Sequence, residues 1–377
     1  MGPKTSIAPA ACVLALLLSA AAQARPIATS ISGMASQMCA SMADGSVECS
    51  GKSYLPQSES SVPVRFPGIA GATAVQTGVR YNCALLASGK VECWGDDGFG
   101  QLGNGSTQDS AVLVEVSGIS DAVALSTGGF HACAVLATGR VMCWGRNRGG
   151  SLGDGTVIDR HVPVEVRGIT DATGVGAGFI QDETCAVLES GRVYCWGSNG
   201  SGQLGNGTHT KSTLPVRVRG VTNAVQVSAS GSHVCAVLAT GSVDCWGSND
   251  GGQLGNASTR SAALPVRVTG IADARAVSVA ARGLSCAVLR GGRVKCWGHN
   301  DKAQLGTGHP TRPSLVPITV VGLSHAVSIT TGHDYACSLL AGGAADCWGY
   351  NDYGRMGFGG GQPRIRGATP VLFTGVG

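Results

Sequence analysis

Charged and aromatic side chains are both scarce in this chain of 377 residues. Asp, Glu, Lys and Arg make up 13% of it, and Phe, Trp and Tyr make up 5%. In an average soluble protein about 25% of the residues are charged. The net charge is only +4, and no run of Lys or Arg occurs. Because binding to nucleic acid requires a concentrated basic surface, we expect no nucleic-acid partner.

Sequence signatures of enzymes are also sparse, since neither an H-E-x-x-H nor a Walker A segment occurs. Residues 98–103 and 200–205 match G-x-G-x-x-G, but both follow an antiparallel hairpin signal, whereas dinucleotide binding needs a strand and a helix of a parallel sheet. His131 and His233 share one position of a repeat, which favours packing over catalysis. We expect no catalytic residue, no cofactor and no metal ligand. A carboxylate pair of the glycosidase type stays open as an alternative.

No apolar run after residue 24 approaches the ~20 residues that cross a membrane. Before it, Lys4 precedes an apolar stretch at 10–22, and Ala22-Gln23-Ala24 has the form of a cleavage site. We predict a signal peptide over 1–24 and a mature chain of 25–377 that is secreted or periplasmic. Pro9 stands where a lipoprotein box before Cys12 requires Leu, so no membrane anchor is expected.

Cysteine, by contrast, is abundant and regularly spaced. Apart from Cys12, the cysteines form pairs ten positions apart: Cys39 with Cys49, Cys83 with Cys93, Cys133 with Cys143, Cys185 with Cys195, Cys235 with Cys245, Cys286 with Cys296 and Cys337 with Cys347. A three-residue turn would place the two members of each pair directly opposite on adjacent strands, which is the geometry of a cross-strand disulfide. The alternative is zinc binding, but zinc ligands usually stand two to four positions apart. We therefore predict disulfides in an oxidising compartment.

A period of about 50 residues runs through the chain. All six tryptophans follow the second cysteine of a pair, and Gln-Leu-Gly-Asn-Gly stands at 101–105 and 203–207. In the third copy, alternating residues indicate strands at 122–127, 132–136, 140–144 and 162–166, with a tight turn at 137–139. Seven such units predict an all-β, seven-bladed β-propeller of four-stranded antiparallel blades.

The ends of the mature chain predict how the ring closes. Residues 28–32 have the pattern of a first strand and residues 370–374 that of a fourth, so we expect the termini to meet. The first unit has Cys49-Ser50-Gly51 in place of Cys-Trp-Gly and lacks Gln-Leu-Gly. We expect this unit to pack more loosely or to form the closing seam.

Together these motifs resemble the regulator of chromosome condensation repeat family. The resemblance rests on residues 129–136 and 231–238, on Cys-Trp-Gly and on Gln-Leu-Gly-Asn-Gly, and it covers about residues 28–377. It implies one propeller scaffold used for unrelated tasks, among them nucleotide exchange on a small nuclear GTPase and docking on nucleosomes. The predicted signal peptide and the lack of a basic arm argue against both tasks here. The paired cysteines depart from the intracellular members.

The connections after each Trp-Gly differ between repeats. In an up-and-down blade they share one face with the first-to-second connections, while the tight turns lie on the other face. Variable residues on a rigid scaffold favour a recognition surface, with plainly solvated loops as the alternative. The candidate partner-binding residues are Asp97, Arg146, Arg148, Gln181, Asp182, Glu183, Asp250, His299, Lys302, Tyr350 and Tyr353. The Asn that recurs at the second place after Trp-Gly is expected to form a turn.

Two function classes remain from the sequence. The first is a monomeric, non-enzymatic propeller that binds an extracytoplasmic protein, as a scaffold or inhibitor, through the variable face. The second is a lectin-like propeller that binds carbohydrate, for which Trp or Tyr exposed on that face is the distinguishing feature. The tryptophans are most simply core residues between blades. A role as a guanine-nucleotide exchange factor is implied by the resemblance alone.

Overall fold

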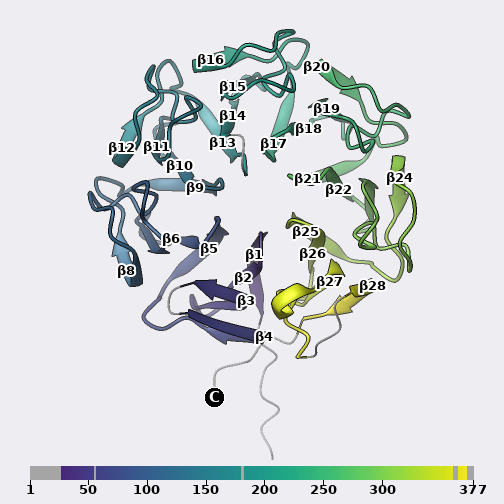
Figure 1. Ribbon diagram of the computed structural model, residues 1–377, viewed down its shortest axis with the longest axis horizontal. Coiled ribbons are helices and arrows are strands. Elements are labelled where there is room, and N and C mark those ends of the chain that lie inside the picture. Colours follow the sequence, from purple (N-terminus) through teal and green to yellow (C-terminus); the bar gives the residue numbers. More distant parts are fainter. Residues whose placement is uncertain (1–26, 55–56, 180–181, 360–363, 372–377) are drawn as a thin grey trace, which may run out of the picture.

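The computed structural model describes residues 27–54, 57–179, 182–359 and 364–371. Its 28 strands form seven antiparallel sheets of four consecutive strands, which stand like blades around a central axis (Figure 1). The predicted all-β, seven-bladed propeller is confirmed. Within the described ranges, the only helix is the short 3-10 turn η1 (Asp352–Gly354), and no helix is long and apolar enough to cross a membrane.

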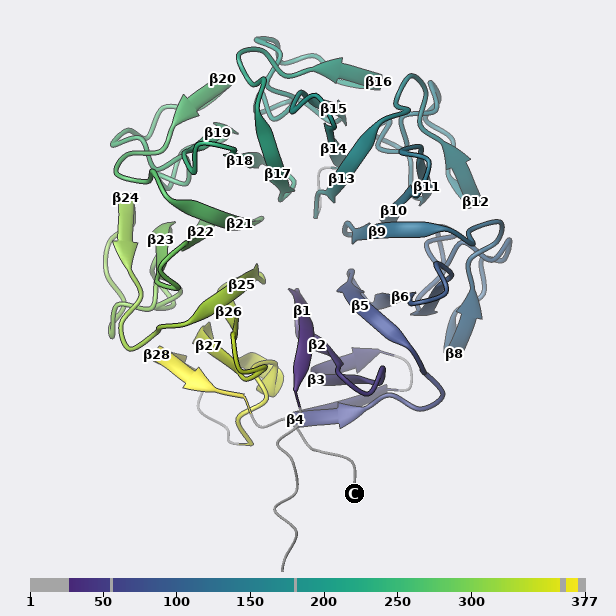
Figure 2. The same ribbon diagram turned by 180° about the vertical axis from the view of Figure 1, so that it is seen from behind.

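We number the blades in chain order; in each, the first strand lines the axis and the fourth lies outermost (Figure 2). Blades 1 and 2 contain β1 (Ala28–Met34), β2 (Gln37–Met42), β3 (Val47–Tyr54), β4 (Gln57–Arg65), β5 (Ala72–Thr77), β6 (Tyr81–Leu86), β7 (Val91–Gly95) and β8 (Ser110–Glu115). Blades 3 and 4 contain β9 (Ala122–Thr127), β10 (His131–Leu136), β11 (Val141–Gly145), β12 (Arg160–Glu165), β13 (Ala172–Ala177), β14 (Glu183–Leu188), β15 (Val193–Gly197) and β16 (Ser212–Arg217). Blades 5, 6 and 7 contain β17 (Ala224–Ala229), β18 (His233–Leu238), β19 (Val243–Gly247), β20 (Ala262–Arg267), β21 (Ala274–Ala280), β22 (Leu284–Leu289), β23 (Val294–Gly298), β24 (Ser314–Thr319), β25 (Ala326–Thr331), β26 (Tyr335–Leu340), β27 (Ala345–Tyr350) and β28 (Arg364–Pro370).

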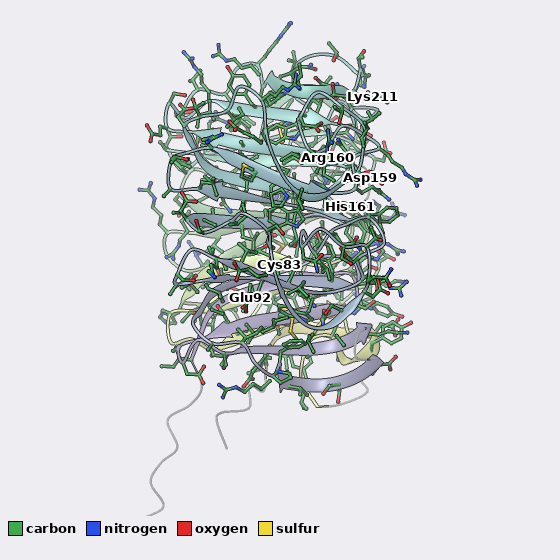
Figure 3. All side chains as sticks on the ribbon, turned by 90° about the vertical axis from the view of Figure 1, so that its left-hand side faces the viewer. Cys83, Glu92, Asp159, Arg160, His161 and Lys211 are labelled. Atoms are coloured by element: carbon green, nitrogen blue, oxygen red, sulfur yellow. A yellow bond between two sulfur atoms is a disulfide. The ribbon has the colours of Figure 1, made fainter. Side chains whose placement is uncertain are left out.

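The two faces of the ring differ in their connections. The long-loop face carries the first-to-second and third-to-fourth connections, which are residues 128–130 and 146–159 in blade 3. The hairpin face carries the tight second-to-third turns, residues 137–140 in blade 3. Viewed edge-on, Asp159 and Lys211 lie toward the same side of the disc, which is the long-loop face (Figure 3).

Each blade is stapled at its centre by one disulfide, so the predicted cysteine pairing is confirmed in full. From blade 1 to blade 7 the bonds join Cys39 to Cys49, Cys83 to Cys93, Cys133 to Cys143, Cys185 to Cys195, Cys235 to Cys245, Cys286 to Cys296 and Cys337 to Cys347. The two cysteines of each bond lie directly opposite in the register of the second and third strands, with Cα atoms 4.0–4.1 Å apart. In blade 3, Gly139 makes the short turn possible because it adopts a φ of 78°. In the loop-entropy view, each such bond stabilises the fold by about 2–3 kcal/mol.

The tryptophans join neighbouring blades. All six are at most 1% exposed. In blades 3 to 7 the indole N–H donates to a backbone carbonyl in the preceding blade at 2.7–3.0 Å. Gly205 lets the Gln-Leu-Gly turn approach this ring, since a Cβ there would stand 2.8 Å from Nε1 of Trp246. The prediction that these rings are core between blades is confirmed.

Blades 7 and 1 form the closing seam, where their strands lie side by side (Figure 1). Ser50, in the place of the missing tryptophan, donates from Oγ to the carbonyl of Arg355 at 2.9 Å, which is the bond that the indole makes elsewhere. Arg355 is 4% exposed and donates across the seam to the carbonyl of Ala35 at 2.8 Å. Its guanidinium carbon lies 5.7 Å from the ring centre of Tyr335. At this interface Ser50 thus makes the bond of the missing indole, and a buried arginine stands in the place of the Gln of Gln-Leu-Gly.

The last strand lies earlier than the sequence suggests. We expect a fourth strand at 370–374, but β28 covers Arg364–Pro370, and residues 372–374 lie outside the described residues. Its register explains the difference, because Thr369 lies opposite Cys347. Val371 then bonds to the carbonyl of Ala345 just as Val166 bonds to that of Val141 in blade 3. The apolar run after Pro370 therefore begins where the strand ends.

Candidate functional site

The structure sorts the eleven candidate residues by exposure. Arg148, Asp250 and Tyr353 are exposed on the long-loop face, and Arg146, His299, Lys302 and Tyr350 are half-buried. Three others, Asp97, Asp182 and Glu183, are buried, and Gln181 lies outside the described residues.

The asparagine after Arg146 closes its loop from within, as the sequence predicts. Oδ1 of Asn147 accepts the N–H of Leu152 at 3.0 Å, and Nδ2 donates to the carbonyl of Ile158 at 3.1 Å. The same acceptor bond recurs at the corresponding Asn of blades 4 to 7. The long loops are therefore held in shape by their own side chains.

Asp97 occupies this same position in blade 2, so the expectation that it faces a partner is corrected. It is fully buried, and Oδ1 accepts the N–H of Leu102 at 2.8 Å. A carboxylate has no N–H to donate to the loop carbonyls, and Oδ2 is left without a partner among the described residues. Burial raises the pKa of Asp97 to about 6.

The prediction that Glu183 binds a partner is also corrected, because Glu183 is buried. It occupies the position in the repeat that His131 and His233 hold in blades 3 and 5. It is fully buried at the start of β14, and Oε1 accepts the N–H of Gly231 in the next blade. No described residue bonds to its Oε2. Burial raises the pKa of Glu183 to about 7.

The two histidines at this position are packed groups, as predicted. Nε2 of His131 lies 2.9 Å from the hydroxyl of Thr184, and Nε2 of His233 lies 2.9 Å from that of Ser285. Both rings are fully buried, and burial lowers the pKa of each to about 3. They are therefore neutral bridges between neighbouring blades.

Asp182 and Arg146 form a fixed ion pair between blades 3 and 4. Nε and Nη2 of Arg146 donate to the carboxylate of Asp182 over distances of 2.8–3.0 Å. The guanidinium carbon of Arg146 also lies 4.5 Å from the ring centre of Phe130. Burial raises the pKa of Asp182, and the charge of Arg146 opposes this shift. The pair is a bidentate, largely desolvated contact of the strong kind.

Around this pair lies an open depression of about 1090 Å³. Its walls include Arg148 of blade 3 and His209 and Lys211 of blade 4, all three exposed. His209 and Lys211 were not among the sequence candidates. They stand at the end of the third-to-fourth connection, whereas most candidate partner-binding residues were chosen from the start of that connection, directly after Trp-Gly.

A second group of candidates lies between blades 6 and 7. Nζ of Lys302 is 5.7 Å from the ring centre of Tyr350, and Arg355 lies 5.6 Å from the same ring. Tyr353 is 44% exposed, and Nζ of Lys52 lies 5.0 Å from its ring centre. Asp250 lies on blade 5, next to Gly251, and the ring of His299 from blade 6 lies over that glycine.

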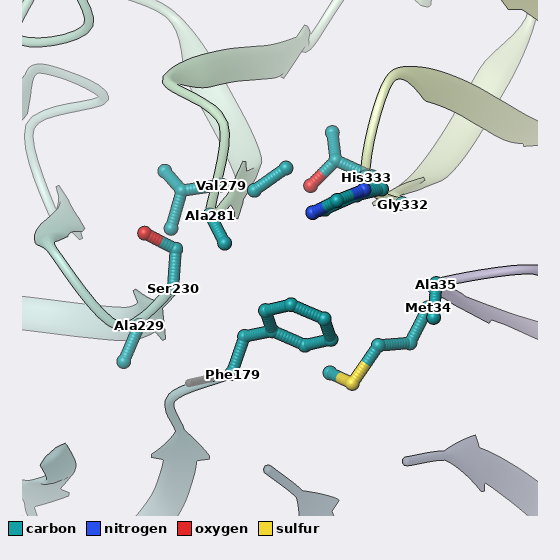
Figure 4. Close-up of a pocket in the computed structure, with 11 residues that line it drawn as sticks. Met34, Ala35, Phe179, Ala229, Ser230, Val279, Ala281, Gly332 and His333 are labelled. Atoms are coloured by element: carbon teal, nitrogen blue, oxygen red, sulfur yellow. The ribbon is translucent and has the colours of Figure 1, made fainter. Parts of the chain in front are cut away.

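Near the axis, the long-loop face holds a smaller hollow of about 260 Å³ (Figure 4). Phe179 and His333 point into it from opposite sides, with ring centres 5.5 Å apart, and Met34 reaches in from blade 1. Phe179 belongs to the connection with two extra residues in blade 4. These side chains narrow the mouth of the central channel.

The side chains of the long-loop face offer charge and hydrogen bonding. Within the described ranges, no group of three His, Cys, Asp or Glu side chains is arranged to hold a metal ion. Residues 149–153 match G-x-S-x-G, the motif of a nucleophile elbow, although we expected no catalytic residue from the sequence. Ser151 is fully buried, however, and donates to the carbonyl of Arg146 at 2.8 Å. It also lies in a turn between strands and not in the strand-to-helix elbow of a nucleophile.

Comparison with known families finds matching repeats between residues 88 and 339. Models of the regulator of chromosome condensation (RCC1) repeat match residues 88–135, 138–179, 190–237, 240–289 and 291–339. A second model of the repeat matches 122–151 and 224–253.

Comparison with individual proteins gives partial sequence matches and a full match of fold. Protein RCC2 of Homo sapiens is 28% identical over 93 residues, which are 24% of this chain and 18% of that protein. The ultraviolet-B receptor UVR8 of Arabidopsis thaliana is 35% identical over 77 residues, 20% of this chain and 18% of that protein. Each match thus spans less than a fifth of the relative. The structure of Prp20p from Saccharomyces cerevisiae superposes with a TM-score of 0.74 and 17% identity, over 92% of this chain and 88% of that one.

Proposed function

Because the chain belongs to the regulator of chromosome condensation (RCC1) repeat family, whose propellers commonly bind proteins or act as exchange factors, we propose that it is a non-enzymatic protein-binding propeller that acts through its long-loop face. The observation that carries the proposal is the depression where Arg146, Arg148 and Lys211 meet. Prp20p, similar in fold, is described by its binding to Gsp1p and histones.

The architecture of the long loops supports this role. Internal bonds such as those of Asn147 hold the loops in shape before any partner arrives. Binding therefore costs less conformational entropy than it would for mobile loops. Arg148, Asp250 and Tyr353 lie between these fixed points and are exposed. Arg148 and Tyr353 stand where the other blades have different residues, whereas the Asp at position 250 recurs in blades 6 and 7.

We place this activity outside the cytoplasm. Seven disulfides fit an oxidising compartment. The predicted signal peptide over 1–24, which lies outside the described residues, leads to the same expectation. The partner would then be a periplasmic or extracellular protein.

A lectin-like role has less support from the side chains. The tryptophans are buried and bonded between blades, so none offers a face to a sugar. Among the side chains that the structure describes, Tyr353 is the one exposed Tyr or Trp. Carbohydrate binding therefore enters as an outcome of the test below.

The test is capture of a partner by the oxidised chain 25–377 from envelope and culture-supernatant proteins, with a glycan array in parallel. The variant carries Arg148→Ala, Asp250→Ala and Tyr353→Ala on the long-loop face. Its control carries Arg192→Ala, Glu189→Ala and Arg293→Ala, which alter exposed residues in or beside turns of the hairpin face.

The proposal expects one protein to be captured saturably by the wild type and the control and to be lost with the long-loop variant. Loss of capture with the control variant alone would indicate that the partner binds to the hairpin face, and it would contradict the proposal. Glycan binding without protein capture would replace the proposal by the lectin reading.

A further inference from the structure

We propose that the depression between blades 3 and 4 binds an acidic segment of the partner protein, with a carboxylate of that segment held between Arg148 and Lys211. The inference rests on the proposed function and names the chemistry of the partner. Three observations support it: the fixed ion pair of Arg146 and Asp182 at the bottom of the depression, two exposed cations at its rim, and its open shape.

The floor is rigid. Arg146 is held by Asp182 on one side and by Phe130 on the other, and the side chains of the pair are only 16% and 7% exposed. Their charges largely compensate one another. The pair therefore fixes the shape of the floor and is not itself available to a partner.

The rim carries the uncompensated charge. Arg148 and Lys211 come from different blades, are exposed, and form no ion pair with any residue in the described part of the chain. The guanidinium carbon of Arg148 lies 5.7 Å from the ring centre of Phe99, which limits where the side chain points. The charge of Arg148 also acts on Asp182, but that carboxylate is already bonded to Arg146. Two cations that line one depression and form no ion pair are complementary to an external anion.

Acidic residues nearby leave this excess in place. Of the residues that line the depression, three are Arg or Lys and one, Asp182, is acidic and already paired. Asp159 lies close enough for its charge to act on Asp182, but its Oδ1 accepts the backbone N–H of Asn147 beneath the loop. The depression therefore keeps a positive potential that favours carboxylates over amines.

The shape favours a peptide over a lone ion or a sugar. The depression is wide and open to solvent, with residues of two blades on its walls, so a peptide backbone can lie across it and place a carboxylate inside. Arg146 lies over the rings of Phe99 and Phe130, so these rings do not offer free faces to a sugar. Ser198 and Gly200 also line the depression, and the hydroxyl of Ser198 can bond to a peptide.

The test uses fluorescein-labelled hexaglutamate as the probe and hexaglutamine as its uncharged counterpart. Fluorescence anisotropy is measured with the oxidised chain 25–377 at low and high salt. Three proteins are compared: the wild type, Arg148→Ala with Lys211→Ala, and the control Arg192→Ala with Arg293→Ala. The control removes the same charge from exposed arginines of the hairpin face.

The inference expects hexaglutamate to bind the wild type and the control equally, and the Arg148→Ala, Lys211→Ala variant about tenfold more weakly, or about 1.4 kcal/mol. Hexaglutamine should not bind, and added salt should weaken the binding of hexaglutamate. Equal weakening in both variants would mean attraction to overall charge and would overturn the inference. So would binding of a sulfated heparin oligosaccharide with no binding of hexaglutamate. If a partner is captured through the long-loop face while hexaglutamate fails to bind, this inference falls and the proposed function stands.

Discussion

At the scale of single residues, the repeats serve as controls for one another, because one position is filled by different side chains in different blades. The residue at the second place after Trp-Gly is the clearest case. Asn147 uses both its acceptor and its donor to close the loop, whereas Asp97 at the same position has only acceptors. A buried oxygen without a donor costs about 1–3 kcal/mol.

Replacing Asp97 by Asn should therefore stabilise the protein. The pKa of Asp97 is raised to about 6 in the folded chain from an ordinary value of 3.8, so the folded state loses stability as the pH rises from about 4 through 6. We expect Asp97→Asn to add about 1–3 kcal/mol at pH above about 7 and almost nothing below about pH 4. Urea unfolding at the two pH values, with the disulfides intact, measures this. Asp250→Asn on the exposed surface is the control, and a gain that did not depend on pH would contradict the account.

Glu183 allows a second prediction at this scale. Burial raises its pKa to about 7 from 4.5, so ionisation weakens the fold as the pH rises between these values. Glu183→Gln keeps the acceptor for the N–H of Gly231 and cannot ionise. We expect the variant to unfold at higher urea concentration than the wild type at pH 8, and at the same concentration at pH 4. A difference at pH 4 as large as that at pH 8 would mean that ionisation is not the cause.

The burial of these two residues shows what sequence reasoning can and cannot reach. Glu183 directly precedes Thr184-Cys185, as His131 precedes Ala132-Cys133, so strict alignment of the repeats would have placed it inside. Asp97 likewise stands where other copies have the turn-forming Asn. The cationic depression was less accessible, because Arg148 and Lys211 lie 63 positions apart and meet only through the packing of two blades.

At the scale of the elements, two features of each repeat account for most of the fold: the central hairpin of the blade and the tryptophan side chain that packs against the preceding blade. The central hairpin of each blade is set by the cysteine spacing and the glycine turn, and these predicted the strands of blade 3 to within two residues. The indole between blades then links each copy to the one before it. The strand that sequence patterning misplaced is β28, because an apolar run after Pro370 resembled a strand more closely than residues 364–370 did.

The seam between blades 7 and 1 gives a prediction at this scale. Arg355→Met should keep the packing of the long side chain but lose its bonds to the carbonyls of Ala35 and Asp352. We expect a loss of about 1–3 kcal/mol in the free energy of unfolding, since two partly buried carbonyls are left without their charged donor. Hydrogen exchange should accelerate first in blades 1 and 7. The exposed Arg290→Met is the control, and faster exchange spread evenly over all blades would contradict a local seam.

At the scale of the whole molecule, the groups that stabilise the ring and the surface that we propose for recognition lie in different places. Disulfides, tryptophans and buried histidines repeat in the interior of the blades, while the residues that differ gather on the long-loop face. The ring closes by packing blade 7 against blade 1. No blade combines strands from both ends of the chain, because β1 and β28 belong to different sheets. The fold could be predicted because the cysteine pairs, the tryptophans and the glycine turns recur in nearly every repeat. The partner could not be predicted in this way, because a binding surface would depend on the residues that differ between repeats.

The proposed export of the chain predicts the composition of the mature molecule. Cleavage after Ala24 would remove Cys12, and the remaining cysteines are all paired. Protein isolated from its natural source should begin at Arg25 and contain no free thiol. Intact mass before and after alkylation measures both. Retention of residues 1–24 or a thiol that reacts without prior reduction would contradict export with complete oxidation.

The most direct test of recognition by the long-loop face is hydroxyl-radical footprinting of the oxidised chain with and without its captured partner. Protection is measured on residues 146–159 and 198–211 of the long-loop face and on residues 137–140 and 189–192 of the hairpin face. The account predicts protection of the first two segments and an unchanged signal from the hairpin turns. Protection confined to the hairpin turns would place the partner on the opposite face and contradict it.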